Sequence, residues 1–393
     1  MPFHKIINDP VYGFITIDDE LINNIIAHPY YQRLRRIHQM AMAHLVYPGA
    51  VHSRLHHSLG AYHLMGCALQ ELRSKGIIIT KEEDQAAKIA ILLHDIGHGP
   101  FSHALEQVMA EGMHHEQISM LLIKELDAHF NGQLQLAIAI FSNQYHKKFL
   151  YQLLSGQLDV DRMDYLTRDS FFTGVNEGAI GYDRILKMLT VHNGELMVEE
   201  KGIYSIEKFL VARRLMYWQV YLHKTVLSAE QMLQRIIKRA RYIGAVCQEP
   251  LNRFINEPLE NATLQDFCSI DDYDVLMAIK QWRNHSDIIL SVLCKGIIDR
   301  VLFKVKYFTN RVDAEQVSAL QQKAADKFNV TFDDAGWLVF TGEATSSTYN
   351  FEGEQIQILF KDGSVKDISE VDDPLINENL RGTIKKYYIC HVR

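Results

Sequence analysis

Apolar residues recur at helical spacing along most of the chain, and this pattern restricts the fold to a mainly helical one. The clearest segment starts at Thr80, which forms a capping box with Glu83 ahead of the run A-A-K-I-A-I-L-L-H-D. Gly97, Gly99 and Pro100 then end that helix. By the same criteria we expect a helix capped by Asp18, a helix after Pro29, and helices at 54–73, 101–111, 114–128, 134–154, 159–170, 181–190 and 205–240.

Strand signals are confined to the two ends of the chain. Residues 3–17 hold two short apolar runs around an N-D-P turn, which predicts an N-terminal hairpin. Near the other end, D-G separates two apolar runs within 354–368, a strong hairpin signal, and 383–392 is typical of a strand. We therefore expect a mainly α protein, with a helical bundle over residues 1–300 and a smaller α+β lobe over residues 301–393.

Composition excludes several classes of protein. The net charge is −7, which argues against a broadly basic nucleic-acid-binding surface and leaves nucleic acid as an unsupported partner. No apolar run approaches the length of a membrane span, and the polar N-terminus does not resemble a signal peptide. The five cysteines include no C-x-x-C pair, which is typical of free thiols in a reducing compartment. We therefore expect a cytoplasmic protein.

Histidine is concentrated at the start of the chain, where 13 of the 19 lie within residues 1–115. The most informative segment is 94–103, H-D-I-G-H-G-P-F-S-H, where an apolar helix runs into a Gly-rich turn. An adjacent His and Asp at a helix end can both face one point, and together they suit a divalent metal. The alternative is a capped helix end whose histidines are polar surface residues. Three histidines within ten residues fit that alternative poorly.

Further ligands are available in two other segments, 52–60 (H-S-R-L-H-H-S-L-G) and 158–169 (L-D-V-D-R-M-D-Y-L-T-R-D). If the second is helical, positions 161, 164, 165 and 168 share one face and Asp159 is a natural N-cap. That geometry favours Asp161 as a metal ligand and Tyr165 as a substrate contact. The alternative for this segment is a solvated, charged helix.

Four residues, His57, His94, Asp95 and Asp161, match the H…HD…D metal signature of the HD superfamily of phosphohydrolases. The segments 8–13, 32–60, 94–103, 115–117, 159–169 and 221–224 further resemble the SAM- and HD-domain deoxynucleoside triphosphate triphosphohydrolases, in the same order. The resemblance covers roughly residues 4–310. Because the chain starts directly with the catalytic unit, we expect no N-terminal SAM domain.

This resemblance implies hydrolysis of a deoxynucleoside triphosphate to a deoxynucleoside and tripolyphosphate by a homodimer or homotetramer. The cofactor would be one divalent transition metal (Zn, Fe, Mn, Ni or Co), with Mg as a further candidate alongside the nucleotide phosphates. Catalysis would involve His98, His103, His115 and Glu116, with His103 near the leaving 5′-oxygen and Glu116 orienting His98 or His103. The substrate contacts implied are Gln39, Arg54, Arg162, Tyr165, Asp169, Arg213 and Tyr221.

Some positions depart from the family pattern or have another interpretation. Lys5, Asn8, Gln32 and Arg35 match the regulatory sites of nucleotide-gated relatives, but Ala27 replaces an expected acidic residue. The segment 195–201 is acidic where those relatives are basic, which argues against nucleotide gating. We interpret Met216, Tyr217 and Trp218 as core residues.

Two other functions compete with this one. An HD phosphohydrolase acting on another nucleotide or phosphoester is the main alternative, although a cyclic-dinucleotide phosphodiesterase would carry H-D-I-G-K where this chain has His98. A non-catalytic nucleotide- or nucleic-acid-binding protein ranks lower, because every metal-ligand position is filled. The chain contains no G-x-x-x-x-G-K-[ST] and no G-x-S-x-G motif, which removes support for a P-loop NTPase or a serine hydrolase.

Overall fold

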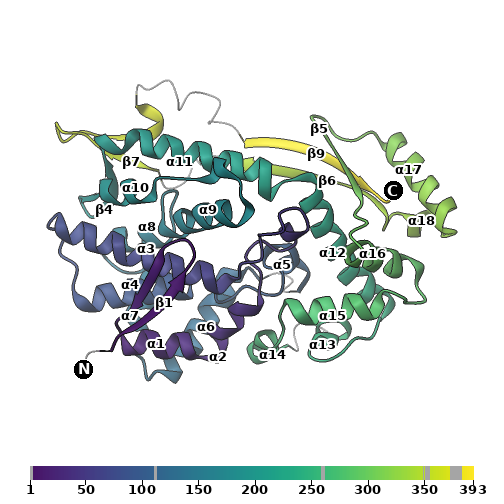
Figure 1. Ribbon diagram of the computed structural model, residues 1–393, viewed down its shortest axis with the longest axis horizontal. Coiled ribbons are helices and arrows are strands. Elements are labelled where there is room, and N and C mark those ends of the chain that lie inside the picture. Colours follow the sequence, from purple (N-terminus) through teal and green to yellow (C-terminus); the bar gives the residue numbers. More distant parts are fainter. Residues whose placement is uncertain (1–2, 110–112, 258–261, 348, 350–354, 372–382) are drawn as a thin grey trace.

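A computed structural model describes the chain except for residues 1–2, 110–112, 258–261, 348, 350–354 and 372–382. Helices form the body, as predicted (Figure 1). They are α1 (Glu20–Ala27), α2 (Pro29–Gln32), α3 (Arg54–Ser74), α4 (Lys81–Leu93), α5 (His103–Met109), α6 (His115–His129), α7 (Gln135–Phe141), α8 (Lys148–Leu154), α9 (Val160–Thr173), α10 (Tyr182–Met188), α11 (Ile203–Met216), α12 (Lys224–Ile243), α13 (Leu251–Asn256), α14 (Leu264–Ser269), α15 (Asp272–Trp282), α16 (Ile288–Ile298), α17 (Ala314–Phe328) and α18 (Phe332–Ala335).

The strands form three small sheets. They are β1 (Lys5–Asp9), β2 (Gly13–Ile17), β3 (Leu189–His192), β4 (Glu195–Glu199), β5 (Lys304–Phe308), β6 (Val339–Ser347), β7 (Gln357–Leu359), β8 (Val365–Asp367) and β9 (Thr383–His391). The sheet orders are β1-β2, β3-β4-β7-β8 and β5-β9-β6. The N-terminal hairpin, the D-G hairpin and the last strand are therefore confirmed.

The sequence analysis missed a mid-chain hairpin and its pairing with a C-terminal strand. An Asn193-Gly194 turn joins β3 to β4, and β7 then adds to β4 in parallel. The C-terminal strands consequently divide between two places, with β7 beside β4 at one end of the molecule and β9 between β5 and β6 at the other (Figure 1). The domain boundary expected at residue 300 stays a prediction. One sheet contains strands from both sides of it, because β4 precedes residue 300 and β7 follows it.

Two long helices of the sequence prediction are wrong, because each is broken. The helix expected at 134–154 is α7 and α8, and Asn143 between them adopts a left-handed conformation with φ +56°. The helix expected at 205–240 is α11 and α12, separated by a π-helical turn at Tyr217–Tyr221. His223 then starts α12 by accepting a hydrogen bond from the Thr225 N–H at Nδ1.

Smaller boundary errors have local causes. The cap of α1 is Asp19, not Asp18, because the Asp19 carboxylate accepts from the Ile22 N–H at 2.9 Å. The helix expected at 181–190 ends at Met188, where β3 begins. No helix in the described part of the chain is long and apolar enough to cross a membrane.

The helices that carry the metal signature start and end as the sequence indicates. The capping box of α4 forms, with the Thr80 N–H donating to Glu83 at 2.8 Å and the Glu83 N–H donating back at 3.2 Å. The last residue of α4 is Leu93, so His94 and Asp95 lie where the chain leaves the helix. Because α3 packs against both α4 and α9, these residues face the start of α3 and the start of α9.

Close approach between α3 and α9 depends on Gly60. A methyl group on Gly60 would lie 2.0 Å from Asp164 Oδ1 and 2.1 Å from Arg168 Nη2. Both of those side chains are fully buried and hydrogen-bonded to each other, so neither can move aside cheaply.

We predict that Gly60→Ala destabilises the protein by about 1–3 kcal/mol or more, because the added methyl overpacks this contact. Gly66→Ala in the same helix is the matched control, since its methyl would meet only the flexible Lys88 side chain at 3.4 Å. The control should be neutral or stabilising by about 0.5–1 kcal/mol. Urea unfolding of the two variants measures the difference; equal stability would contradict the prediction.

Candidate metal site and pocket

The four residues of the metal signature converge on one point. His57 Nε2 lies 3.0 Å from Asp161 Oδ1 and 3.5 Å from Asp95 Oδ2. His94 Nε2 lies 3.3 Å from His57 Nε2, 3.3 Å from Asp95 Oδ1 and 3.5 Å from Asp161 Oδ1. Ligands about 2.1 Å from a shared cation lie roughly 3.0–3.4 Å apart. The spacing of His57, His94 and Asp161 therefore fits a single divalent ion, and Asp95 lies beside His94 as the fourth candidate ligand.

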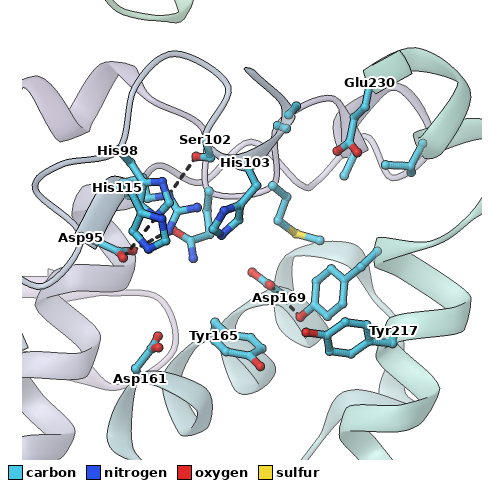
Figure 2. Close-up of a pocket in the computed structure, with 18 of the residues that line it drawn as sticks. Asp95, His98, Ser102, His103, His115, Asp161, Tyr165, Asp169, Tyr217 and Glu230 are labelled. Atoms are coloured by element: carbon cyan, nitrogen blue, oxygen red, sulfur yellow. Dashed lines mark hydrogen bonds and ion pairs between the residues drawn. The ribbon is translucent and has the colours of Figure 1, made fainter. Parts of the chain in front are cut away.

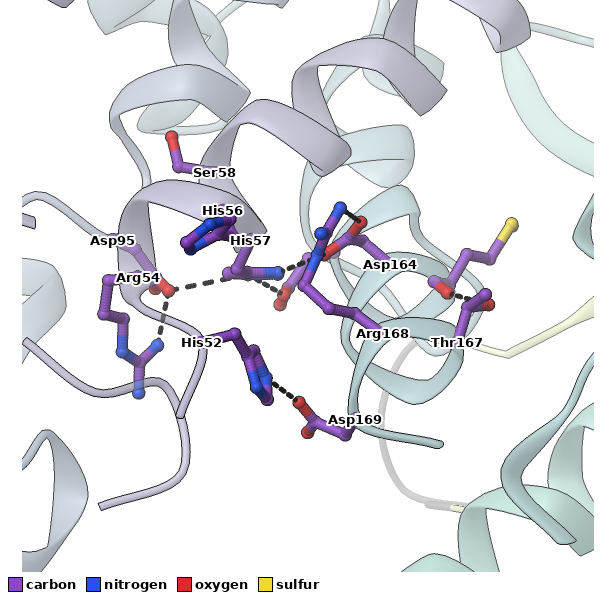
Figure 3. A network of polar contacts seen from close by, with 12 residues as sticks. His52, Arg54, His56, His57, Ser58, Asp95, Asp164, Thr167, Arg168 and Asp169 are labelled. Atoms are coloured by element: carbon purple, nitrogen blue, oxygen red, sulfur yellow. Dashed lines mark hydrogen bonds and ion pairs between the residues drawn. The ribbon is translucent and has the colours of Figure 1, made fainter. Parts of the chain in front are cut away.

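Hydrogen bonds fix which ring nitrogens face that point. His57 Nδ1 donates to Asp164 Oδ2 at 2.7 Å, and His94 Nδ1 donates to the Ile91 carbonyl at 2.6 Å. Both Nε2 atoms are thereby left free to bind a cation. Asp164 also accepts from Arg168 (Figure 3). Arg168 in turn donates to Asp9 at 2.8 Å.

The electrostatics of the cluster favour a cation. Burial alone would raise the pKa of Asp95, but the Arg54 guanidinium and the nearby histidines hold that pKa well below its usual range. Burial alone would lower the pKa of His57, but hydrogen bonds to Asp161 and Asp164 raise it to about 10. The carboxylates thus stabilise positive charge at the point where the four residues meet.

The site opens into a pocket of about 450 Å³, within the usual size range for small-molecule sites (Figure 2). Nearly all of the substrate and catalytic residues expected from the sequence line it. They are Gln39, Arg54, His98, His103, His115, Arg162, Tyr165, Asp169, Arg213 and Tyr221. The expected metal ligands Asp95 and Asp161 line the same pocket.

Glu106, which was not predicted, holds two of the pocket histidines. Its carboxylate accepts from His103 Nδ1 at 2.9 Å and from both Nδ1 and the backbone N–H of His115, at 2.9 and 2.8 Å. The ring of His115 stacks on His98 with centroids 4.0 Å apart. Burial, followed by the Arg54 charge, lowers the pKa of His98 well below its usual value, so its imidazole is neutral.

The structure corrects the role expected for Glu116. Glu116 follows His115 on α6, and successive helix residues point about 100° apart, so it is exposed when His115 faces inward. Glu106 contacts His103 in its place. The signal for this contact was the i, i+3 spacing of H-A-L-E at the start of α5.

A strained turn presents His98 and His103 to the pocket. Phe101 and Ser102 both adopt left-handed conformations, with φ +54° and +52°. The buried carboxylate of Asp272 accepts from the Phe101 N–H at 2.6 Å, and Ser102 Oγ donates to the His38 carbonyl at 2.9 Å. These contacts hold a conformation that the local sequence alone disfavours.

Asp169 anchors the opposite wall. It accepts from His52 Nε2 at 2.7 Å and from the Tyr221 hydroxyl at 2.8 Å. Burial and then the Asp169 charge raise the pKa of Tyr221 well above its usual value, so the hydroxyl stays protonated. Tyr217 also lines the pocket, next to Tyr221 with ring centroids 5.3 Å apart, so its interpretation as a core residue is wrong. Tyr217 and Tyr221 are four residues apart, so they share one helical face, and both lie on the pocket side.

Three arginines contribute cationic groups to the pocket wall. Arg54 donates to Asp95 and, through Nε, to Ser102 Oγ at 2.9 Å. Arg162 pairs with the N-cap residue Asp159. Among the described residues, Nε and Nη1 of the buried Arg213 have no hydrogen-bond partner. Unpaired buried guanidinium groups at a pocket wall favour an anionic ligand.

The positions that matched regulatory sites meet at a separate pocket of about 530 Å³. Lys5, Asn8, Gln32 and Arg35 line it together with Ala27. Arg35 Nε donates to Gln32 Oε1 at 2.7 Å, so these two side chains bind each other.

Comparisons with known proteins agree with this geometry. Residues 54–169 match the HD domain and residues 180–332 match the HD associated region. The protein YwfO of Bacillus subtilis is 32% identical over 383 residues, covering 93% of this chain and 87% of YwfO. A solved phosphohydrolase from Bacteroides thetaiotaomicron is 45% identical, with a TM-score of 0.96 and full coverage of both chains.

More distant matches carry a more specific description. A deoxynucleoside triphosphate triphosphohydrolase SAMHD1 homolog from Dictyostelium discoideum is 30% identical over 58% of this chain, which spans 48% of that protein. The Gallus gallus SAMHD1 is 29% identical over 60% of this chain, which spans 45% of that protein. The chain therefore belongs to the HD-domain family, carries the HD associated region, and is related to these triphosphohydrolases.

Proposed function

We propose that this protein is a metal-dependent phosphohydrolase that cleaves a deoxynucleoside triphosphate into a deoxynucleoside and tripolyphosphate. The observation that carries the proposal is one pocket that combines a cation site, unpaired arginine N–H groups and a polar wall that includes Gln39 and Asp169. The related triphosphohydrolases support the choice of substrate class.

The metal would be held by His57, His94, Asp95 and Asp161. A divalent ion there would lower the pKa of an attacking water and polarise the α-phosphorus. The N–H groups of Arg213, with Arg54 and Arg162, would bind the phosphate oxygens and stabilise the negative charge that develops on them.

His103 would give a proton to the departing 5′-oxygen. Glu106 accepts from Nδ1 of His103, which leaves Nε2 to exchange the proton and stabilises the ring when it is charged. His98 and His115, stacked beside it, would contact the phosphates. Their fixed positions on Glu106 and Asp95 avoid a costly rearrangement during the reaction.

The sugar would lie between Gln39 and the Asp169 wall. Asp169 and the buried Oε1 of Gln39, which has no partner among the described residues, can both accept from a 3′-hydroxyl. Tyr165 and Tyr221 are edge-to-face, with centroids 6.2 Å apart, and would pack on the ring where a 2′-hydroxyl would project. Assembly into a homodimer or homotetramer and a cytoplasmic location stay predictions.

We predict that the purified protein with a divalent transition metal converts deoxynucleoside triphosphates to deoxynucleoside and tripolyphosphate. Anion-exchange chromatography of the products identifies them, with a panel of metals and with GTP or dGTP as additive. Monophosphate and pyrophosphate as products would assign the site to another phosphoester reaction, and no turnover under any condition would reject the proposal.

We predict that Asp161→Ala abolishes both bound metal and turnover, because it removes a ligand from the centre of the donor set. Asp164→Asn should keep the metal but weaken its affinity by about 10–100-fold, because the amide orients His57 less strongly. Metal analysis after dialysis against a weak chelator compares the two variants. Wild-type metal content in Asp161→Ala would contradict the ligand assignment.

We predict that Glu106→Gln lowers kcat by about 10²-fold, because proton transfer by His103 suffers. KM should rise by a smaller factor, because Glu106 also holds His115. The alkaline limb of the pH profile should also move to lower pH, because a general acid must be protonated and Glu106 no longer stabilises the charged His103 ring, whereas a purely structural role would not produce this shift. Glu116→Gln is the matched control and should resemble the wild type. Equal losses in the two variants would remove Glu106 from the mechanism.

A further inference from the structure

One face of α12 forms the end of the pocket that lies away from the metal ligands. Val226, Glu230 and Gln234 follow one another at four-residue spacing and all line the pocket. Glu230 extends inward from the side opposite Asp95 and Asp161 (Figure 2). Neither its carboxyl group nor Gln234 is assigned any role in the hydrolysis proposed above.

The surroundings of Glu230 are poor in polar partners. Ala43 and Ala104 line the same pocket from η2 (Ala43–Leu45) and α5, two of the elements that pack against α12. Among the described residues, no hydrogen bond or ion pair joins another side chain to the Glu230 carboxyl. Loss of hydration on burial raises the pKa of Glu230 to about 8. An inward-facing carboxyl of this kind is costly to bury unless a ligand supplies donors.

The position of Glu230 limits which part of a ligand it can meet. If the triphosphate lies at the cation site and the sugar lies between Gln39 and Asp169, the base is the part left to face α12. This step rests on the proposed function, because it takes the orientation of the substrate from it. A polar group at this end therefore contacts a nucleobase edge.

Donors from a bound ligand would stabilise the charged form of Glu230 against its raised pKa. In that form the carboxylate distinguishes the bases by the donors that they offer. Guanine offers two parallel donors on one edge, N1–H and the N2 amino group, which two carboxylate oxygens can accept together. Adenine and cytosine present a ring-nitrogen acceptor at the corresponding place, and thymine flanks its single N–H with two carbonyl oxygens, so each would repel the carboxylate. A buried hydrogen-bonding group rejects ligands that leave it unpaired.

We infer that Glu230 is the base-specificity residue of this enzyme and selects guanine, by accepting N1–H and the N2 amino group. Gln234 lies one helical turn further along and donates its side-chain amide to guanine O6. Both contacts are remote from the reacting phosphorus, so they alter the choice of base and leave the chemical step unchanged.

The test compares dGTP with dITP, which differ only in the N2 amino group. The wild type should show a kcat/KM for dGTP about 10-fold above that for dITP, and Glu230→Gln should bring the two within about 2-fold. Gln234→Leu should lower both equally relative to dATP, since both keep O6. Glu315→Gln, an exposed acid-to-amide change on α17, is the matched control and should preserve the wild-type ratio. Thermal unfolding verifies that each variant is folded.

Two outcomes separate this inference from the proposed function. If dNTPs are hydrolysed but Glu230→Gln leaves the dGTP to dITP ratio unchanged, the base assignment is wrong and the function stands. If no dNTP is hydrolysed, calorimetric titration with deoxyguanosine and deoxyinosine still tests Glu230. Tighter binding of deoxyguanosine that is lost in Glu230→Gln supports the assignment; equal binding, or none, overturns it.

Discussion

The buried carboxylate of Asp164 is the contact on which the candidate site depends. It accepts from His57 Nδ1 and from Arg168, and Arg168 continues to Asp9 at the end of β1. One fully buried network therefore joins the N-terminal hairpin, α3 and α9. Loss of either partner would leave an uncompensated charge at a cost of about 3–5 kcal/mol. The three elements are consequently held in one arrangement. That arrangement aims His57 Nε2 at Asp95 (Figure 3) and at Asp161.

The sequence correctly predicted structural features that depend on neighbouring residues in the chain. The Thr80–Glu83 capping box sets where α4 begins, and the placement of His94 and Asp95 at its end follows from that start and the glycines beyond it. Features that depend on residues far apart in the chain could not be predicted. Apolar spacing continues through Asn143 and through Tyr217–Tyr221, so nothing in it signals the breaks that tertiary packing imposes there. The parallel pairing of β7 with β4 likewise joins segments with no shared local signal.

The residues of the candidate site likewise divide into those that the sequence predicted and those that it did not. Its metal ligands could be predicted because their residue types and order are characteristic of one family. Glu106 was missed although its spacing from His103 was visible, because Glu116 also offered a carboxylate close to the histidines in sequence. Only the orientation of α6 distinguishes them. The contact of Asp272 with the Phe101–Ser102 turn links residues far apart in the chain, and it offsets a backbone strain of about 1–3 kcal/mol per residue.

Overall charge says little about the ligand that this pocket suits. The chain carries a net charge of −7, yet three arginines face the same cavity as the cation site. Asp95 and Asp159 offset part of the charge of Arg54 and Arg162, whereas Arg213 keeps N–H groups without a partner among the described residues. A bound divalent cation would add further positive charge that these carboxylates alone do not balance. Under the proposed function, the triphosphate would supply negative charge at this end of the pocket, and the uncharged base would reach α12.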